Sequence, residues 1–278
     1  MNRNTMFFKV FATMAISVFI VMAGCKSGTQ EQTSDDDLQM QEIDKESIEK
    51  EVESLVMHLP TPFEFAEMLN NIGARYVDEV LNSPDHIDRY FTERQQALNL
   101  GVYGADLGYS SVYDKTQQTK EYLDAVRTLL NELKVDVDYS FFTDEDKRAQ
   151  LNNQDTLVHV LTNTFYEAYE FLNEKNSSEL TALMAAGTWI EGLYIATHIS
   201  DDTYNNIDMV KLIYDQAQSL EQLLQLMEKF KNNPDVSDLY NHLQELRSAY
   251  KSTDGSLTRE ELSAIKDKIG AIRNDVVS

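Results

Sequence analysis

Apolar side chains recur at helical spacing through most of the chain. From about Ile43 onward they return every third or fourth residue, which places them on one face of a helix, and the alternation typical of strands is rare. One such stripe consists of Leu157, Val160, Leu161, Thr164, Phe165, Ala168, Phe171 and Leu172. The pattern therefore predicts an all-α fold.

Start and stop signals divide the chain into about nine or ten helices. Capping residues or first-turn prolines mark several starts, at Thr61-Pro62, Ser83-Pro84, Ser177 or Ser178, Asn233-Pro234 and Thr258-x-x-Glu261. The predicted helices span residues 43–58, 62–82, 85–113 (with a break near Gly101 as an alternative), 116–134, 144–152, 156–174, 178–199, 204–232, 235–251 and 257–275. We expect one irregular multi-helix domain over residues 43–278, for which a superhelical array of helical hairpins is one arrangement.

Small residues gather in two of these helices. They are Ala97, Gly101, Gly104, Ala105 and Gly108 in one, and Ala182, Ala185, Ala186, Gly187, Gly192 and Ala196 in the other. Glycine inside a helix is up to about 1 kcal/mol less favourable than alanine, so a close approach should compensate for it. We expect these two helices to lie centrally and to pack against each other. A ligand seated against their exposed backbone is the alternative.

The N-terminal segment has the layout of an export signal. An apolar run over residues 10–22 ends at Val21-Met22-Ala23-Gly24-Cys25, which resembles the lipobox of bacterial lipoproteins, although that family more often has Leu where this chain has Val21 or Met22. The resemblance implies cleavage between Gly24 and Cys25, a diacylglycerol group on the Cys25 thiol, and a further acyl chain such as palmitate. An ordinary secretory signal with an unrelated cysteine is the alternative.

Residues 25–42, which follow the signal peptide of residues 1–24, are polar and acidic. We expect them to form a disordered tether between the lipidated Cys25 and the domain. Glu31 and the run Asp35-Asp36-Asp37 also resemble the surface-export signals of Bacteroidota-type lipoproteins, whereas a plain solvated linker explains the same residues. The expected location is the bacterial outer membrane, with the domain periplasmic or surface-exposed.

The charge of the chain narrows the choice of partners. The net charge is −23, from 24 basic and 47 acidic residues, and removal of Arg3 and Lys9 with the signal leaves −25. Such a chain repels phosphate backbones and anionic lipid head groups. We therefore expect no nucleic acid as partner, membrane contact through the N-terminal lipid alone, and either partners with cationic patches or no partner at all.

Recognisable catalytic and metal-binding motifs are absent from the sequence. The segment from Tyr250 to Glu261 resembles the second half of an EF-hand loop, with Asp254, Gly255 and Glu261 in place, but Tyr250 stands where the first carboxylate is needed. A helix–loop–helix turn with a capping box explains the same residues. None of the five histidines belongs to a His-Glu-x-x-His pair. We expect neither a metal nor a cofactor.

If the domain has a pocket, charged groups on the two small-residue helices are the best candidates for it. They are Asp106 and Glu191, with Arg75, Tyr103, Trp189, Tyr194 and His198 as neighbours in sequence or type. Buried ion pairs and hydrogen bonds within the core are the structural alternative.

As a whole the chain resembles the all-helical lipoproteins of Bacteroidota-type bacteria, above all in the stretch from Leu98 to Tyr109. The resemblance implies location and fold, and no activity. The first functional hypothesis is a non-catalytic envelope or surface lipoprotein whose helical domain binds a protein, peptide or glycan. The alternatives are a hydrolase with an unrecognised active site on the central helices and a structural spacer.

Overall fold

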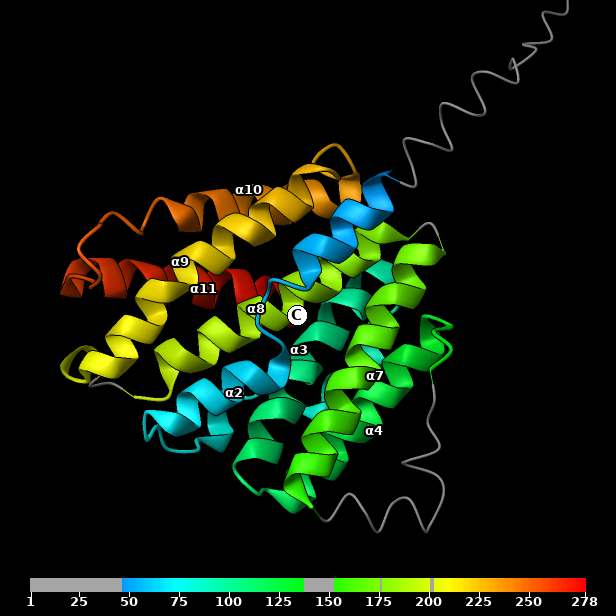
Figure 1. The fold of residues 1–278 in the computed structure, drawn as a ribbon, viewed down its shortest axis with the longest axis horizontal. Coiled ribbons are helices and arrows are strands. Elements are labelled where there is room, and N and C mark those ends of the chain that lie inside the picture. Colours follow the sequence, from blue (N-terminus) through cyan, green and yellow to red (C-terminus); the bar gives the residue numbers. More distant parts are fainter. Residues whose placement is uncertain (1–46, 138–152, 176, 201–202) are drawn as a thin grey trace, which may run out of the picture. The chain divides into compact units, whose positions relative to one another are not determined.

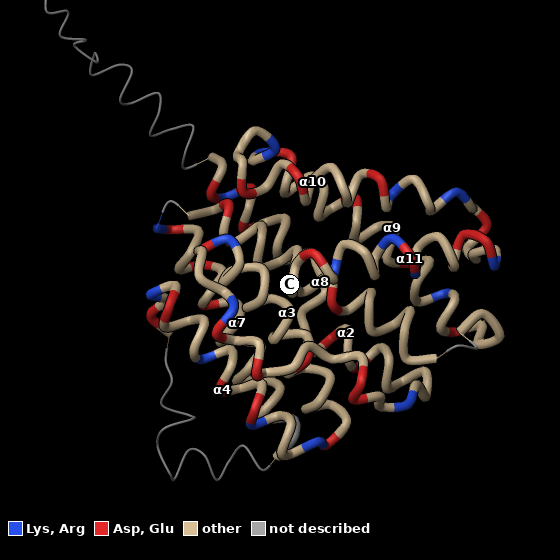
Figure 2. The backbone as a smooth tube through the Cα atoms, turned by 180° about the vertical axis from the view of Figure 1, so that it is seen from behind, with Lys and Arg blue, Asp and Glu red and all other residues tan. Residues whose placement is uncertain are grey.

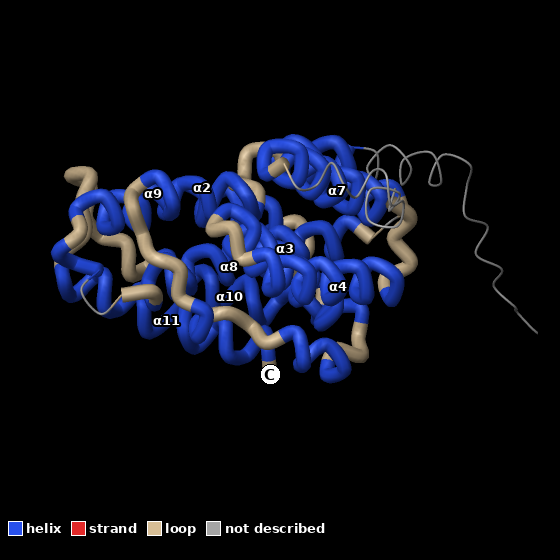
Figure 3. Tube along the Cα trace, turned by 90° about the horizontal axis from the view of Figure 1, so that it is seen from below, coloured by secondary structure: helices blue, strands red, loops and turns tan. Residues whose placement is uncertain are grey.

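The folded part of the chain consists of helices joined by loops (Figure 1). The computed structural model describes residues 47–137, 153–175, 177–200 and 203–278. Over these residues there is no strand, as the view from below also shows (Figure 3). Residues 41–278 form one compact unit. The prediction of an all-α fold is confirmed.

Four sequence predictions lie outside the described residues. They are the signal peptide 1–24, the cleavage and lipidation site at Gly24 and Cys25, the tether 25–42 and the helix 144–152. Among the residues that are described, no helix combines the length and the apolar character needed to cross a membrane.

Long α-helices alternate with short 3-10 turns in the described part of the chain. The elements are helical residues 47–56, α2 (Pro62–Asn71), η1 (Asp78–Val80), η2 (Pro84–Arg89), α3 (Glu93–Val112), α4 (Thr116–Glu132), α7 (Gln154–Glu174), α8 (Ser178–His198), η3 (Thr203–Asn205), α9 (Ile207–Glu228), α10 (Pro234–Arg247) and α11 (Arg259–Val277).

Side-chain caps fix most of the predicted helix starts. Thr61 and Thr258 each form a complete capping box, with Glu64 and Glu261. The side chain of Asn233 caps α10 just before its first-turn proline. The predicted serine cap of α8 was wrong, because Ser177, at the N-cap position, makes no side-chain cap bond.

The two small-residue helices, α3 and α8, form the centre of the domain. Both are buried around nearly their whole circumference, as expected of a core helix. They cross at Gly101 and Gly187: a Cβ on Gly101 would overlap the carbonyl oxygen of Met184, and a Cβ on Gly187 that of Leu98. The predicted central position and close approach are confirmed.

The remaining helices pack around this pair. Helices α2, α4 and α7 contact α3, α9 and α11 contact α8, and α10 packs on α9 and α11 (Figure 1). The other glycines of the central helices also admit close neighbours. Gly104 faces the ring of Phe165, and a Cβ on Gly108 would lie 2.7 Å from the carbonyl oxygen of Pro62.

Two predicted helix boundaries were wrong in one region. The helix expected over 62–82 ends at Asn71, and Gly73 then takes a positive φ of 72° that ends the helical path. The helix expected over 85–113 is a 3-10 turn, η2, followed by α3. Thr92 starts α3 with a capping box to Gln95, and the helix continues without a break through Gly101.

Candidate functional site

The chain between α2 and η2 forms an extended segment along one face of α3. We call residues 74–83 the strap. Except for the single turn η1, the strap lacks helical hydrogen bonding, so its backbone polar groups need other partners. Side chains of α3 provide them.

Two tyrosines of α3 and its C-cap hold the first half of the strap. The Tyr113 hydroxyl donates to Ala74 O at 2.9 Å, and the Tyr109 hydroxyl donates to Arg75 O at 2.8 Å. The Tyr109 hydroxyl also accepts from Val77 N at 3.2 Å. The tyrosines that recur at helical spacing in the sequence therefore fix the chain's own backbone.

The second half of the strap is held one to two turns earlier on α3. Asn82 N donates to Asp106 Oδ2 at 3.2 Å, and the Tyr103 hydroxyl donates to Ser83 O at 2.9 Å. With Tyr109, these α3 residues are spaced by three, so they share one face of the helix. The strap therefore runs antiparallel to α3.

Asp106 and Glu191, the two carboxylates singled out in the sequence, meet beneath the strap. Both are 0% exposed. The guanidinium of Arg273, on α11, binds Glu191 through two hydrogen bonds of 3.0 Å, from Nε to Oε2 and from Nη2 to Oε1. Its Nη2 also donates to Val80 O in the strap at 3.4 Å. We call Asp106 and Glu191 the acid pair.

The cluster contains one guanidinium and two buried carboxylates, and this imbalance of charge favours protonation of one carboxylate. Burial raises the pKa of Asp106 well above its ordinary value, and the neighbouring Glu191 raises it further. Burial also raises the pKa of Glu191, but Arg273 opposes that shift. Oδ1 of Asp106 meets no donor, whereas its side chain lies within hydrogen-bonding reach of Glu191. Protonation of Asp106 lets its carboxyl group donate a hydrogen bond to Glu191 and leaves the cluster neutral.

Three other predicted site residues lie beside this cluster. Tyr103 adjoins it through the strap, and burial raises its pKa, with a smaller contribution from Asp106. The ring of Tyr194 lies under Arg273, 4.7 Å from Cζ to the ring centroid. His198 stacks on Tyr194 at 4.0 Å between centroids, and burial lowers its pKa.

Two predicted site residues do not take part. The side chain of Arg75 is exposed, and its backbone oxygen is the atom that contacts Tyr109. Trp189 is buried in the apolar core, where its indole Nε1 has no hydrogen-bond partner.

Arg273 is the residue of this cluster that the sequence reasoning missed. A signal for it exists in the apolar stripe of α11, which contains Ile265, Ile269, Ile272 and Val276. Arg273 follows Ile269 by four positions, so it points to the same side of the helix. A charged residue at a core position requires a buried partner of opposite charge.

Both carboxylates of the acid pair are 0% exposed. Two-carboxylate hydrolysis needs both groups to line a cleft that admits substrate and water. Among the described residues no group of three potential ligands is placed to hold a metal ion. The hydrolase alternative therefore gains no support from this geometry.

The EF-hand-like loop is closed by its own residues. The Glu261 carboxylate accepts from Ser252 N at 2.7 Å, Ser252 Oγ at 2.6 Å, Lys251 N at 3.0 Å, and Thr258 N and Oγ1 at 2.8 Å. These bonds, led by that from Ser252, lower the pKa of Glu261 to about 2. They occupy the carboxylate that calcium would need.

A shallow surface groove lies between α10 and α11. It is lined by His242, Glu245, Asp267, Lys268, Ala271, Ile272 and Asp275. The lining combines both signs of charge with the apolar side chains of Ala271 and Ile272.

No family model, curated protein or solved structure matches the chain in comparisons with known proteins. The case for a function therefore rests on the chain's own residues.

Proposed function

We propose that this protein is a lipid-anchored component of the bacterial cell envelope, attached through Cys25, whose helical domain binds a partner without catalysis. The partner is a protein, peptide or glycan with a cationic surface. The observation that carries the non-catalytic part is the sealed acid pair. Asp106 and Glu191, the candidate reactive groups of the central helices, are used to hold the strap and α11.

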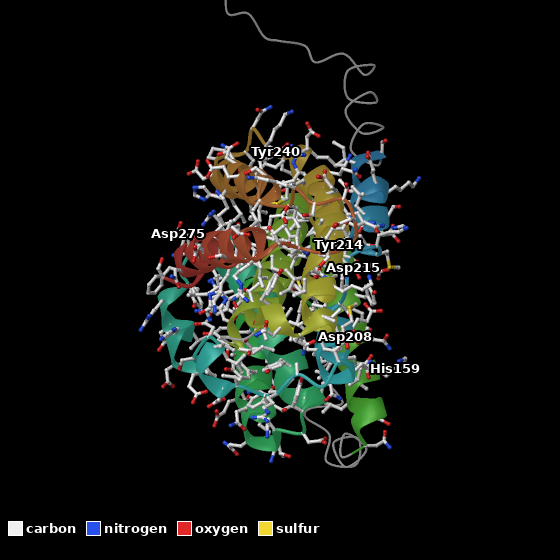
Figure 4. All side chains as sticks on the ribbon, turned by 90° about the vertical axis from the view of Figure 1, so that its left-hand side faces the viewer. His159, Asp208, Tyr214, Asp215, Tyr240 and Asp275 are labelled. Atoms are coloured by element: carbon white, nitrogen blue, oxygen red, sulfur yellow. The ribbon has the colours of Figure 1, made fainter. Side chains whose placement is uncertain are left out.

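The distribution of charge supports a cationic partner. The net charge of the chain is −23, and acidic residues are spread over the outer helices (Figure 2). Asp208 and Asp215 on α9 and Asp275 on α11 are exposed examples (Figure 4). A surface of this sign attracts basic partners over about one Debye length, roughly 8 Å at physiological salt, and repels nucleic acid.

The anchor is tested by metabolic labelling of the full chain with palmitate in a bacterial host that processes lipoproteins. We expect the wild-type chain to be labelled and to sediment with outer membranes, and Cys25→Ala to lose both properties. Ser27→Ala, two residues away, is the matched control and should behave as wild type. Labelled Cys25→Ala protein would contradict the proposal. Protease treatment of intact cells then distinguishes a surface-exposed domain from a periplasmic one.

Partner binding is tested by cross-linking the anchored protein in intact cells of the species that carries the gene. We expect enrichment of an envelope component, weakened at high salt and in an Asp208→Lys plus Asp215→Lys variant. Asp208→Asn plus Asp215→Asn should weaken it less. If nothing is enriched above the charge-reversed variant, the domain is a spacer and not a binding module.

A further inference from the structure

The acid pair and the strap are mechanically linked. Asp106 accepts one strap hydrogen bond, from Asn82 N, and Arg273 makes another, to Val80 O. Asp106, the partner of Glu191 in the acid pair, is therefore also one of the residues that bind the strap.

We propose that the strap is a proton-dependent cover: a proton shared between Asp106 and Glu191 keeps it closed, and loss of that proton loosens it. The cluster would then couple the pH around the envelope to the order of residues 74–83. This inference does not depend on which partner the domain binds.

The geometry leaves the strap as the part that can yield. A second negative charge on the acid pair would leave Oδ1 of Asp106 charged and without a donor. The helices that carry the two carboxylates could separate only by opening the close backbone packing at Gly101 and Gly187. Water can solvate the new charge only if a covering segment moves. The strap is the cover that lacks regular helical hydrogen bonding.

Groups on every neighbouring element bear on this charge. They are Glu191 on α8, Arg273 on α11, Tyr103 on α3 itself, Tyr122 on α4, Tyr76 in the strap and, through Arg273, His86 in η2 and His198 on α8. Arg273 is the cation among them, and it is already committed to Glu191. Burial raises the pKa of the three tyrosines, so they stay neutral while Asp106 titrates.

His86 is the competing source of a pH response. Its Nδ1 lies 3.0 Å from Asn82 Oδ1, next to the strap, and burial lowers its pKa. A His86→Gln variant therefore separates the two explanations.

The experiment measures amide hydrogen exchange of the strap in the full protein from mildly acidic to alkaline pH, after correction for the intrinsic base-catalysed rate. In the wild type we expect strap protection to fall about tenfold for each pH unit above the ordinary pKa of an aspartic acid, and the fall to end at the raised pKa of Asp106 in the closed state. Asp106→Asn, which is isosteric and cannot ionise, should give protection that does not change with pH. An unchanged pH slope in Asp106→Asn would overturn the proposal.

Two further variants assign the effect. Tyr109→Phe removes strap hydrogen bonds without removing the acid pair, so strap protection should fall by a similar factor at every pH and keep the wild-type slope. His86→Gln should also keep the wild-type slope, and loss of the slope in that variant would transfer the role to the histidine.

A measurement on the wild-type chain keeps the proposal testable even if Asp106→Asn fails to fold. Infrared spectra of protein labelled with ¹³C-aspartate should show a protonated-carboxyl stretch at neutral pH. The band should disappear at the pH where the fall in strap protection ends. If no aspartic acid band is present, or if it disappears at a pH where protection is still falling, the proposal is wrong.

Discussion

Helices α3 and α8 meet twice within little more than one turn, in two chemically opposite ways. At Gly101 and Gly187 the backbones touch, and the Thr188 hydroxyl donates to Gly101 O at 3.3 Å. Slightly further along both helices, Asp106 faces Glu191 in a site that is equally sealed from solvent. The first contact, which we call the glycine crossing, contains no ionisable group, and the second is ionisable.

The difference shows how one contact imposes conditions on the other. The glycine crossing holds the two backbones in close packing, so the acid pair could move apart only if that packing opened. Replacing a buried ionic cluster by well-packed apolar residues is often neutral or stabilising by about 1–4 kcal/mol. Tight packing therefore explains the stability of the core, while the acid pair contributes a dependence on pH.

The largest effect on stability is expected where the glycine crossing is disrupted. In Gly187→Ala the new Cβ overlaps the carbonyl oxygen of Leu98, which belongs to a backbone that cannot turn aside. We expect a loss of more than about 5 kcal/mol in the free energy of unfolding, or no folded protein at all. Chemical denaturation followed by circular dichroism measures it.

Gly270→Ala, inside α11, is the matched control. Its Cβ would meet nothing nearer than His198 Nε2 at 3.5 Å, so the better helix propensity of alanine should stabilise the protein by up to about 1 kcal/mol. Similar losses in both variants would mean that the close approach at the crossing is not what makes the glycine necessary.

The second prediction concerns the acid pair and its counterion and leaves the glycine crossing intact. Arg273→Met keeps an unbranched apolar stem but leaves the charge of Glu191 without a counterion. We expect a loss of about 3–5 kcal/mol in the free energy of unfolding. Adding Glu191→Met should recover most of it, because the uncompensated charge is then gone. If Arg273→Met alone stays within about 1 kcal/mol of wild type, which is the range typical of surface ion pairs, the pair of Arg273 and Glu191 is solvated.

The two contacts also differ in how far the sequence predicts them. Between Arg94 and the end of α3, Asp106 is the one charged residue, and Glu191 has the same place in α8 after Glu179. Small residues at helical spacing predicted the crossing, and isolated charges on the same helices indicated the acid pair. Both signals are local to one helix and can be read from its residues alone.

The strap and Arg273 could not be predicted in the same way. The helix-like composition of residues 72–82 favours a continuation of α2, and the hydroxyls that replace its helical hydrogen bonds come from Tyr109 and Tyr113, more than thirty positions later. Arg273 lies 82 positions from Glu191. Only the tertiary fold reveals such partners, because propensity within a segment does not include them.

The smallest expected effect concerns Glu261, a carboxylate whose pH dependence is opposite to that of Asp106. Glu261 accepts hydrogen bonds from the loop before α11, which lower its pKa from the ordinary 4.5 to about 2. The contribution of Glu261 to stability is therefore complete above pH 4.5 and is lost as the pH falls toward 2. The pKa of Asp106 is raised from 3.8, so its contribution to stability is lost as the pH rises above that value. We expect Glu261→Gln to lower the free energy of unfolding by about 1–2 kcal/mol at neutral pH, and the gap from wild type to narrow in acid. Glu260→Gln, at the exposed neighbouring position, should change stability by less than about 0.5 kcal/mol at any pH. Thermal unfolding across acidic pH measures both variants, and a gap that widens in acid would contradict the role assigned to the Glu261 carboxylate.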